Sequence, residues 1–462
     1  MTDAQTTPAD DLEDEIQLGE PRVRAIREAL EARDRTALDD LLEPLHGADI
    51  ADLLEQLSDY QRSALLELWS GHIDGEILSE LDEALREEIL GALPAEDVAE
   101  AVRDLETDDV VDLVENLDDT DQASAILGAL DDADRVAVEQ ALTYPEFSAG
   151  RLMQREVVIA PSFWNVGQAI DHMRSSEDLP DQFYHVILTD PRMRAVGYVT
   201  LGKILSSPRD TALSEIEEDS FRTFEVTDSE GDVAYAFNQY HLISAPVVDA
   251  DDRLLGVITI DDAIRILEEE AEEDILRLAG VDAEESLSNR TIGVVRRRFP
   301  WLAVNLVTSI LASLVIAQFD AVITQIVALA VLMPIVASMG GNAGTQSLTV
   351  AVRALATKDL TGANVWRVIR REVAAGAING VAFAIIMGIV GVIWFGSPML
   401  GVVIAVAMVI NLIVAGLAGV GIPVVLQKIG IDPALASGAF VTTVTDVVGF
   451  FAFLGLAALW LL

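Results

Sequence analysis

The sequence contains no cysteine among its 462 residues. Disulfides, zinc–thiolate sites, iron–sulfur clusters and cysteine nucleophiles are therefore excluded. Phosphate-binding loops of the GxxxxGK(S/T) type, HExxH metal motifs and nucleophile elbows are also missing. We therefore expect a protein that is not an enzyme.

The second half of the chain has almost no charge. Residues 300–462 hold six cationic and five anionic side chains, a net charge of +1. Removing these from the 30 cations and 76 anions of the whole chain leaves 24 and 71 in residues 1–299, a net charge of −47. A surface this acidic repels phosphates, so we expect no nucleic-acid partner. The chain therefore combines an acidic soluble half with an apolar half.

Apolar stretches long enough to cross a lipid bilayer follow Phe299. A helix needs about 20 residues to span a hydrocarbon core of roughly 30 Å. Five spans are predicted, near residues 300–318, 322–350, 374–394, 400–425 and 436–461. Arginines precede the first span and lie between the second and third, so the positive-inside rule places the acidic N-terminal half in the cytoplasm. After five crossings the C-terminus lies outside, and we expect a multi-pass protein of the cell's inner (plasma) membrane.

Two segments of the acidic half resemble each other. Residues 186–205 and 245–264 each contain a β-branched strand, a polar turn, a glycine-led strand and the start of a helix, with Gly197 and Gly256 at equivalent positions. The pattern predicts one α/β unit present twice. It resembles a tandem CBS-domain pair, a module that usually senses small ligands and dimerises.

Residues 20–142 carry apolar side chains at helical spacing, interrupted by short acidic turns. Short helices at regular intervals predict a superhelical stack. We therefore predict a multidomain membrane protein with an all-α superhelical N-domain, an α/β tandem CBS pair and an all-α transmembrane domain of five helices. The predicted boundaries are 1–17 for a disordered tail, 18–145 for the N-domain, 146–207 and 208–272 for the CBS repeats, 273–298 for a connecting, plug-like helix and 299–462 for the transmembrane domain.

Two polar features interrupt the apolar half. Residues 338–347, SMGGNAGTQS, form a glycine-rich run that either packs helices closely or unwinds so that carbonyls face a water-filled path. Asp446 is the only charge in the last span and is surrounded by Thr442, Thr443 and Thr445. Such a carboxylate faces a cavity, a cation or a partner, or stays protonated in a structural hydrogen bond. Oxygen ligands without thiolate or imidazole favour a hard cation such as Mg²⁺ or Ca²⁺.

The order of these regions resembles that of the MgtE-type magnesium transporters, as do the stretches PIVASMGGNAGTQS, RALATKDL and DPALASGAFVTTVTDVVGF. The resemblance implies a homodimeric, Mg²⁺-selective, channel-like transporter, with Mg²⁺ as both its substrate and its regulatory ligand. It implies a pore site formed by Asp446, Asn342, Gly341, Thr345 and Thr442. The chain departs from the family at Thr345, where the family often has an asparagine. A hydroxyl oxygen remains there, but the amide is gone.

The same resemblance implies that cytosolic Mg²⁺ closes the pore by bridging acidic groups. The expected regulatory ligands in the helical N-domain, or head, are Glu76, Asp108 and Asp112. Those at the end of the second CBS repeat and in the connecting segment are Asp262, Glu270, Glu273 and Asp274. Asp432 is a further acid, at the cytoplasmic end of the last span. Carboxylates about 5 Å apart repel by roughly 3 kcal/mol at an effective dielectric of 20, and a bridging divalent ion reverses that sign. The alternative interpretation is that these acids are ordinary solvated side chains.

Some CBS pairs of this family bind ATP, but His241–Leu242 stands where we associate an acidic–aromatic pair with that site, which argues against ATP binding here. Another divalent cation, such as Co²⁺ or Ni²⁺, is an alternative cargo. A non-transporting membrane sensor that signals through its CBS domains is the alternative from another class, and the lone intramembrane Asp446 argues against it.

Overall fold

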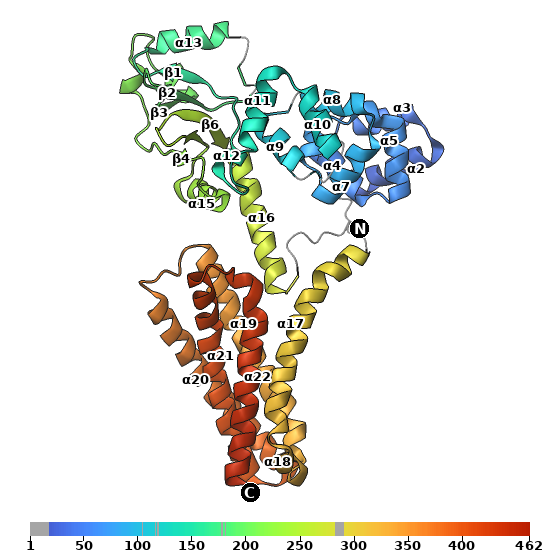
Figure 1. Ribbon diagram of the computed structural model, residues 1–462, viewed down its shortest axis with the longest axis vertical. Coiled ribbons are helices and arrows are strands. Elements are labelled where there is room, and N and C mark those ends of the chain that lie inside the picture. The colour runs from blue at the N-terminus through green and yellow to red at the C-terminus, as the bar shows by residue number, and fades with distance from the viewer. Residues whose placement is uncertain are drawn as a thin grey trace, which may run out of the picture. The chain divides into compact units, whose positions relative to one another are not determined.

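The computed structural model describes residues 18–103, 105–115, 117, 120–176, 179–180, 182–281 and 291–462. The chain divides after Glu268 into two compact units (Figure 1). The first unit contains the helical head and the CBS repeats, and the second contains the apolar helices. The predicted disordered tail, residues 1–17, lies outside the described residues.

The head of the first unit is a stack of short helices. In the described residues they are α2 (Glu20–Ala32), α3 (Arg35–Leu42), α4 (Gly47–Gln56), α5 (Asp59–Trp69), α6 (Gly75–Ser79), α7 (Glu83–Ala92), α8 (Ala95–Arg103), α9 (Thr107–Glu115), α10 (Thr120–Ala129) and α11 (Asp132–Ala141). Their apolar faces form one continuous core, as the helical spacing predicted. Aspartates such as Asp34, Asp74 and Asp131 accept backbone N–H bonds at helix starts, which explains why acidic turns separate the helices.

The two CBS repeats each form a three-stranded sheet. The first sheet has the order β1 (Ile159–Pro161), β2 (His185–Thr189), β3 (Ala195–Thr200), and the second has the order β4 (Phe224–Glu225), β5 (Ser244–Val248), β6 (Leu254–Thr259). The first pair in each sheet is parallel and the second antiparallel, with His185 opposite Thr200 and Ser244 opposite Thr259. The same topology and register in both sheets confirm the predicted repeat.

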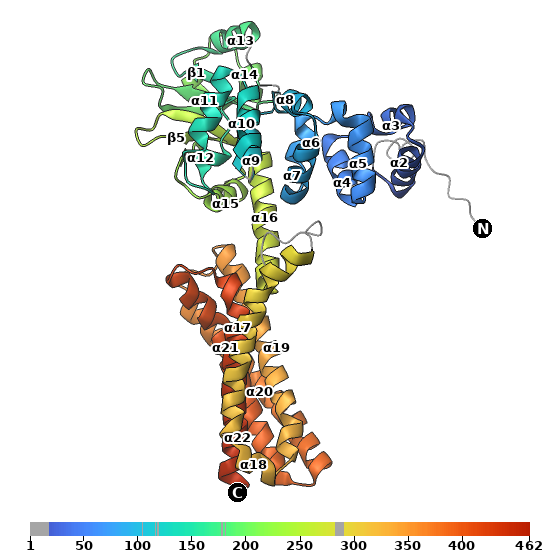
Figure 2. The same cartoon turned by 45° about the vertical axis from the view of Figure 1, so that its right-hand side comes forward.

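Helices complete each repeat (Figure 2). They are α12 (Ala149–Leu152), α13 (Val166–Ser175), α14 (Leu201–Ser206), α15 (Glu230–Tyr240) and α16 (Ile260–Leu278). Strands β1 and β4 were not predicted, because two or three residues are too few to show a period of two. Within the predicted connecting segment 273–298, α16 ends at Leu278 and α17 begins at Thr291, and residues 282–290 lie outside the described residues.

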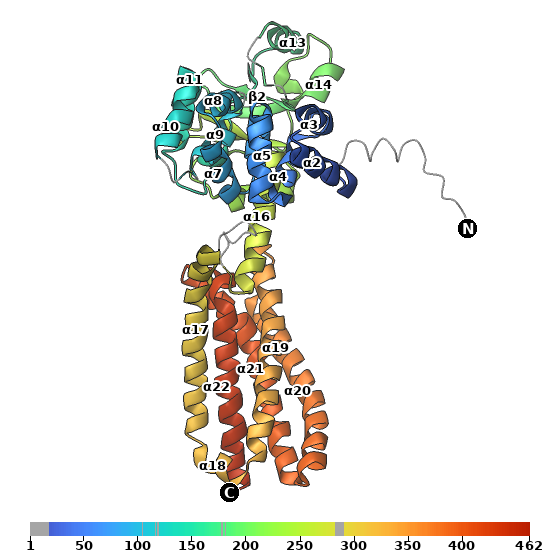
Figure 3. The same ribbon diagram turned by 90° about the vertical axis from the view of Figure 1, so that its right-hand side faces the viewer.

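The second unit contains the apolar helices, which lie side by side (Figure 3). They are α17 (Thr291–Ala317), α18 (Asp320–Gln325), α19 (Ala328–Ala356), α20 (Val365–Phe395), α21 (Pro398–Lys428) and α22 (Pro433–Trp460). Within the described residues, five are long and apolar enough to cross a bilayer, all except the short α18. With the helical head and the repeated sheets, these helices confirm the predicted fold class.

The second span begins later than predicted. The structure ends α18 at Gln325 and starts α19 at Ala328, with Ile326 at φ −128°, ψ 79° between them. The apolar run is continuous in sequence across this break, so hydropathy alone could not locate it. Further along, α19 is continuously helical through the glycine-rich run, so the run is not unwound.

Helix α21 lies at the centre of the unit. In the apolar 18-residue stretch of α21, 56% of the residues are buried, whereas in that of α17 only 6% are buried. Glycines let the neighbouring helices approach it closely: a Cβ at Gly416 would lie 2.6 Å from the Glu372 carbonyl oxygen of α20, and a Cβ at Gly419 would lie 2.7 Å from the Gly344 carbonyl oxygen of α19. Close packing is therefore one role of the small residues in these spans.

Candidate metal sites in the two units

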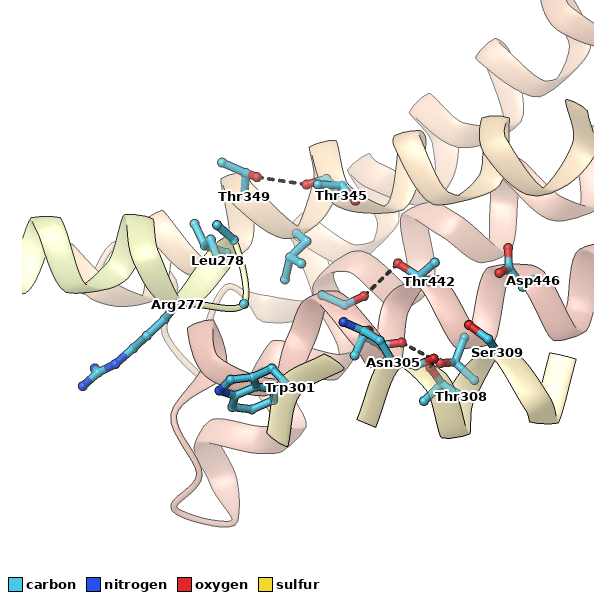
Figure 4. A pocket seen from close by; sticks show the side chains of 16 residues that line it. Arg277, Leu278, Trp301, Asn305, Thr308, Ser309, Thr345, Thr349, Thr442 and Asp446 are labelled. Atoms are coloured by element: carbon cyan, nitrogen blue, oxygen red, sulfur yellow. Dashed lines mark hydrogen bonds between the residues drawn. The ribbon is translucent and has the colours of Figure 1, made fainter. Parts of the chain in front are cut away.

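A cavity of about 300 Å³ lies in the second unit, against the end of α16, α17, α19 and α22 (Figure 4). Three of the predicted pore residues line it: Thr345 on α19 and Thr442 and Asp446 on α22. Thr442 and Asp446 are four residues apart on one helix and therefore share a face. The structure thus brings the predicted carboxylate together with two predicted hydroxyl groups.

The hydroxyl groups of this cavity donate their protons to the backbone. Thr345 Oγ1 donates to the Gly341 carbonyl at 3.0 Å, Thr442 Oγ1 to the Gly438 carbonyl at 2.9 Å, and Thr443 Oγ1 to the Ala439 carbonyl at 2.6 Å. A hydroxyl whose proton is used in this way presents only lone pairs to its surroundings. Together with the Asp446 carboxylate, these oxygens make a lining of acceptors, which suits the water shell of a cation.

Two predicted ligands lie elsewhere on α19. Gly341 and Asn342 are not among the residues that line the cavity. Asn342 Nδ2 donates to Ser338 Oγ at 3.4 Å within its own helix. The Gly341 carbonyl accepts the Thr345 hydroxyl, so its contribution to the cavity is indirect. Their roles as ligands stay predictions.

The first span supplies a polar face that was not predicted. Asn305, Thr308 and Ser309 of α17 line the cavity opposite α22, with Trp301 at its edge (Figure 4). Thr308 Oγ1 donates to the Asn305 carbonyl at 2.9 Å, so it too presents an acceptor. The signal was present in the sequence as polar residues at i, i+3 and i+4 of an apolar helix.

Two of the predicted regulatory acids of the first unit, Asp108 and Asp262, meet where α9 faces the start of α16. Asp108 is 5% exposed and its Oδ1 has no hydrogen-bond partner among the described residues. Asp262 is also buried and accepts from Thr259 Oγ1 at 2.8 Å. Burial raises the pKa of Asp108 well above its ordinary value, and the neighbouring Asp262 raises it further. Burial likewise raises the pKa of Asp262.

Other predicted regulatory acids of this unit are paired with basic side chains. Asp112 lies 2.7 Å from Arg86 and 3.4 Å from Arg265, and Glu76 lies 3.1 Å from His46. The two arginines beside Asp112 provide charge neutralisation that a metal ion would otherwise supply. Sequence reasoning did not predict the pairing, because the partners are distant in sequence or sit on another helix.

The remaining predicted acids gather around Arg277 in the second unit. Arg277 lies 2.7 Å from Glu273 and 2.8 Å from Asp432, which also caps α22 by accepting from the Ala434 N–H at 2.7 Å. Burial raises the pKa of Asp274 to about 6, and Asp432 and Glu270 add to the effect. Glu273, Asp274 and Asp432 therefore lie near one cation, and Glu270 lies near Asp274.

No preformed metal cage is present in the part of the chain that the structure describes. There, no three or more histidine, aspartate or glutamate side chains are arranged to hold an ion. An ion at any of these places would have to keep much of its water, as Mg²⁺ commonly does, or draw the acids together on binding.

Family comparisons assign most of the chain. A family described as "Divalent cation transporter", MgtE, matches residues 333–456, the "MgtE intracellular N domain" matches residues 45–147, and the "CBS domain" matches residues 213–269. The matches fall on the apolar helices, on the helical head and on the second sheet-containing repeat.

Named relatives extend over most of the chain. "Magnesium transporter MgtE" of Enterococcus faecalis is 34% identical over 324 residues, which cover 70% of this chain and 71% of that protein. The protein of the same name from Thermus thermophilus is 32% identical over 335 residues, or 72% of this chain and 74% of that protein. The Bacillus subtilis protein of that name is 28% identical over 331 residues, or 72% and 73%.

Two solved structures match about half of this chain. The "soluble part of a magnesium transporter" is 24% identical, covers 55% of this chain and 99% of that chain, and has a TM-score of 0.48. The "cytosolic domain of the Mg2+ channel MgtE in complex with ATP" is 27% identical, covers 53% and 99%, and has a TM-score of 0.49.

Proposed function

The chain belongs to the MgtE family of divalent cation transporters, and from this membership and the site geometry we propose that it carries Mg²⁺ through the cavity beside Asp446. The observation that carries the proposal is the cavity lining. One carboxylate and several hydroxyl groups line this cavity, and the hydroxyl groups donate their protons to backbone carbonyls. The surrounding helices are long enough to span a membrane. A hydrated Mg²⁺ donates hydrogen bonds through its water and carries two positive charges, so it fits such a lining.

The driving force in this proposal is the membrane potential. Moving a divalent cation inward gains about 4.6 kcal/mol per 100 mV, twice the value for a single charge. The sequence contains no nucleotide-hydrolysis motif, so passage downhill through a channel-like path is the simplest mechanism. The chain would lie in the plasma membrane with its acidic unit in the cytoplasm and its C-terminus outside, because arginines precede the first span and lie between the second and third.

We propose that the working form is a homodimer. Mg²⁺ commonly touches one or two carboxylates, and each chain supplies one in the last span, Asp446. A two-fold axis beside α22 would place two such carboxylates at one aqueous site.

Cytosolic Mg²⁺ regulates the pathway in this proposal by binding acids of the soluble unit and of the α16 end. Asp108 is the strongest candidate ligand there, because it is buried beside Asp262 and leaves one oxygen without a partner. A divalent ion between the two carboxylates would replace repulsion by attraction and favour the docked, closed arrangement. The ion shifts the balance only because it binds the closed state better than the open one.

Flux into liposomes tests the transport proposal. Purified wild-type protein, Asp446→Asn and Asp320→Asn would be compared; Asp320 is an exposed acid at the start of α18 and outside the cavity. We expect Mg²⁺ flux from wild type and Asp320→Asn, and its loss from Asp446→Asn without loss of dimer assembly. No flux from folded wild-type protein would favour the sensor alternative, and faster flux of Co²⁺ or Ni²⁺ than of Mg²⁺ would change the cargo.

Inhibition by Mg²⁺ on the cytoplasmic face tests the regulatory part. Asp262→Ala combined with Glu270→Ala should raise the Mg²⁺ concentration needed for closure. The control removes the same charge from two exposed acids, by Glu139→Ala with Glu215→Ala. An unchanged inhibition curve in the first variant would argue against these regulatory ligands.

A further inference from the structure

Helix α21 buries one polar side chain at the centre of the second unit. Asn411 is the sole side chain able to form ordinary hydrogen bonds between Pro398 and Leu426, and it is 0% exposed. Its Nδ2 donates to the Val336 carbonyl of α19 at 2.8 Å. Its Oδ1 has no hydrogen-bond partner among the described residues. An apolar side chain of similar shape would avoid this unpaired acceptor, so packing alone does not explain an asparagine here.

Glycines on two other helices make room for this amide. A Cβ at Gly340 of α19 would lie 2.8 Å from Asn411 Cγ, and a Cβ at Gly449 of α22 would lie 2.8 Å from Asn411 Nδ2. Both distances are shorter than real Cβ contacts, so any larger residue at either glycine would displace a helix or the amide. The side chain of Asn411, which projects from α21, therefore lies between α19 and α22.

The two glycines that contact Asn411 are close in sequence to the predicted pore residues. Gly340 directly precedes Gly341, and Thr345 follows one turn later on α19. Gly449 lies one turn after Asp446 on α22. The Asn411 amide thus contacts each of the two helices within about one turn of a predicted pore residue.

We propose that Asn411 is a positioning residue that sets the spacing between α19 and α22, and through it the distance from Thr345 to Asp446 across the cavity. The hydrogen bond to the Val336 carbonyl holds the amide against α19. Gly340 and Gly449 leave just enough room for the amide, so its size sets how closely α19 and α22 approach each other. A path whose width is set in this way discriminates between cations by the size of their water shell. The inference rests on the proposed function only for this last step, because the spacing itself is a property of the fold.

Disulfide formation measures the spacing without any transport. The chain has no cysteine, so a single engineered pair, Gly341→Cys with Thr442→Cys, reports on α19 and α22 alone. A Cβ at Gly341 would meet only Thr442 Cγ2, at 3.9 Å, so the pair lies within reach of a bond with a small motion. Into this full-length background we would introduce Gly340→Ala, Asn411→Ala, both together, or Leu412→Ala as the control. Leu412 is equally buried in α21 but faces Gly380 of α20.

Gly340→Ala adds a methyl group against the amide and should slow disulfide formation about tenfold, as an added barrier of ~1.4 kcal/mol does. Asn411→Ala removes the amide and should restore the rate in the double variant, whereas Leu412→Ala should leave it unchanged. The rescue separates a spacing role from general destabilisation. An unchanged rate in Gly340→Ala, or no rescue by Asn411→Ala, would overturn the inference even if the protein carries Mg²⁺.

Selectivity gives a second measurement in the cysteine-free protein. We expect Asn411→Ala to change the ratio of Mg²⁺ to Ca²⁺ flux by about fivefold or more, and Leu412→Ala to leave the ratio unchanged even where it lowers the amount of folded protein. A flux ratio is independent of protein amount, so poor folding cannot imitate the effect. Equal ratios of Mg²⁺ to Ca²⁺ flux in wild type and Asn411→Ala would contradict a role in selectivity. The spacing role would then be decided by the rate of disulfide formation. Absence of flux from wild type would contradict the proposed function and not the spacing.

Discussion

Arg265 on α16 lies 3.4 Å from Asp112 on α9 and 3.2 Å from Asp262 on its own helix. The guanidinium therefore joins the helical head to the second CBS repeat with a charge bridge. Asp112 also contacts Arg86 at 2.7 Å, so the bridge extends to α7. These residues are partly buried, which makes their pairing stronger than that of an exposed ion pair. In this chain an arginine thus does part of the neutralisation that was predicted for Mg²⁺.

We predict that Arg265→Gln makes the contact between head and CBS repeat depend on Mg²⁺. Without the guanidinium, Asp108 and Asp262 lose the positive charge that offsets their mutual repulsion, and an added cation can take its place. Amide hydrogen exchange of α9 in the full-length protein should become about tenfold faster in metal-free buffer, as a loss of ~1.4 kcal/mol of local stability gives. Millimolar Mg²⁺ should restore protection.

The control for this measurement is Arg253→Gln, because the Arg253 guanidinium is exposed and lies 3.9 Å from Asp251 on the surface. Its exchange pattern should match that of wild type with and without Mg²⁺. Arg265→Gln with wild-type protection in metal-free buffer would show that the arginine does not hold the two elements together.

How far the sequence predicts this protein depends on how local each signal is. The five apolar helices, the repeated strand–turn–strand units and the helical head follow from periodicity, which a single segment displays by itself. Asp446 stood out because it is the only charge in its span. The partners of the acids could not be read in the same way. Arg86 and Arg265 reach Asp112 only after folding, and Asn411 acquires meaning only once Gly340 and Gly449 lie beside it.

A pH dependence follows from Glu106, at the start of α9. Burial raises the pKa of Glu106 to about 7, although a hydrogen bond from Gln154 Nε2 at 2.6 Å opposes the shift. The folded state therefore binds this proton more tightly than the unfolded state does. The stability contributed by Glu106 is full below its ordinary value of 4.5 and is lost as the pH rises through about 7.

We therefore predict that Glu106→Gln reduces the loss of thermal stability between pH 5 and pH 8. Glutamine keeps the acceptor for Gln154 and removes the titration. The change in melting temperature across this range should shrink by about 2–4 °C, the shift that roughly 1 kcal/mol gives in a unit of this size, after a discount for partial exposure. The exposed Glu139→Gln serves as the control in the same scanning fluorimetry series. Parallel pH curves for wild type and Glu106→Gln would contradict the argument.

The polar face of α17 predicts a second contribution to flux. Thr308→Val with Ser309→Ala replaces two acceptors of the cavity by apolar groups of similar size. Mg²⁺ flux should fall about fivefold to thirtyfold, because each of the two lost water contacts costs roughly 0.5–1 kcal/mol. Ser313→Ala is the matched control: Ser313 lies one turn further along α17, donates to the Ser309 carbonyl at 2.9 Å and is not among the residues that line the cavity. Equal flux from both variants would exclude α17 from the path.

Removal of Arg277 should change the cytoplasmic Mg²⁺ concentration at which flux is half-inhibited, and the direction of the change shows what the arginine does. Arg277 contacts Glu273 and Asp432 and lies near Asp274, so its removal leaves the acids at the end of α16 without their nearest positive charge. If these acids bind regulatory Mg²⁺, Arg277→Gln should strengthen that binding. Half-inhibition of flux should then occur at about threefold to tenfold lower cytoplasmic Mg²⁺, the effect of roughly 0.7–1.4 kcal/mol. If instead the bond from Arg277 to Asp432 is itself what holds the closed state, half-inhibition should move to higher Mg²⁺. Inhibition curves of wild type, Arg277→Gln and Arg277→Lys decide between the two, because lysine keeps the charge and should stay near wild type in either case.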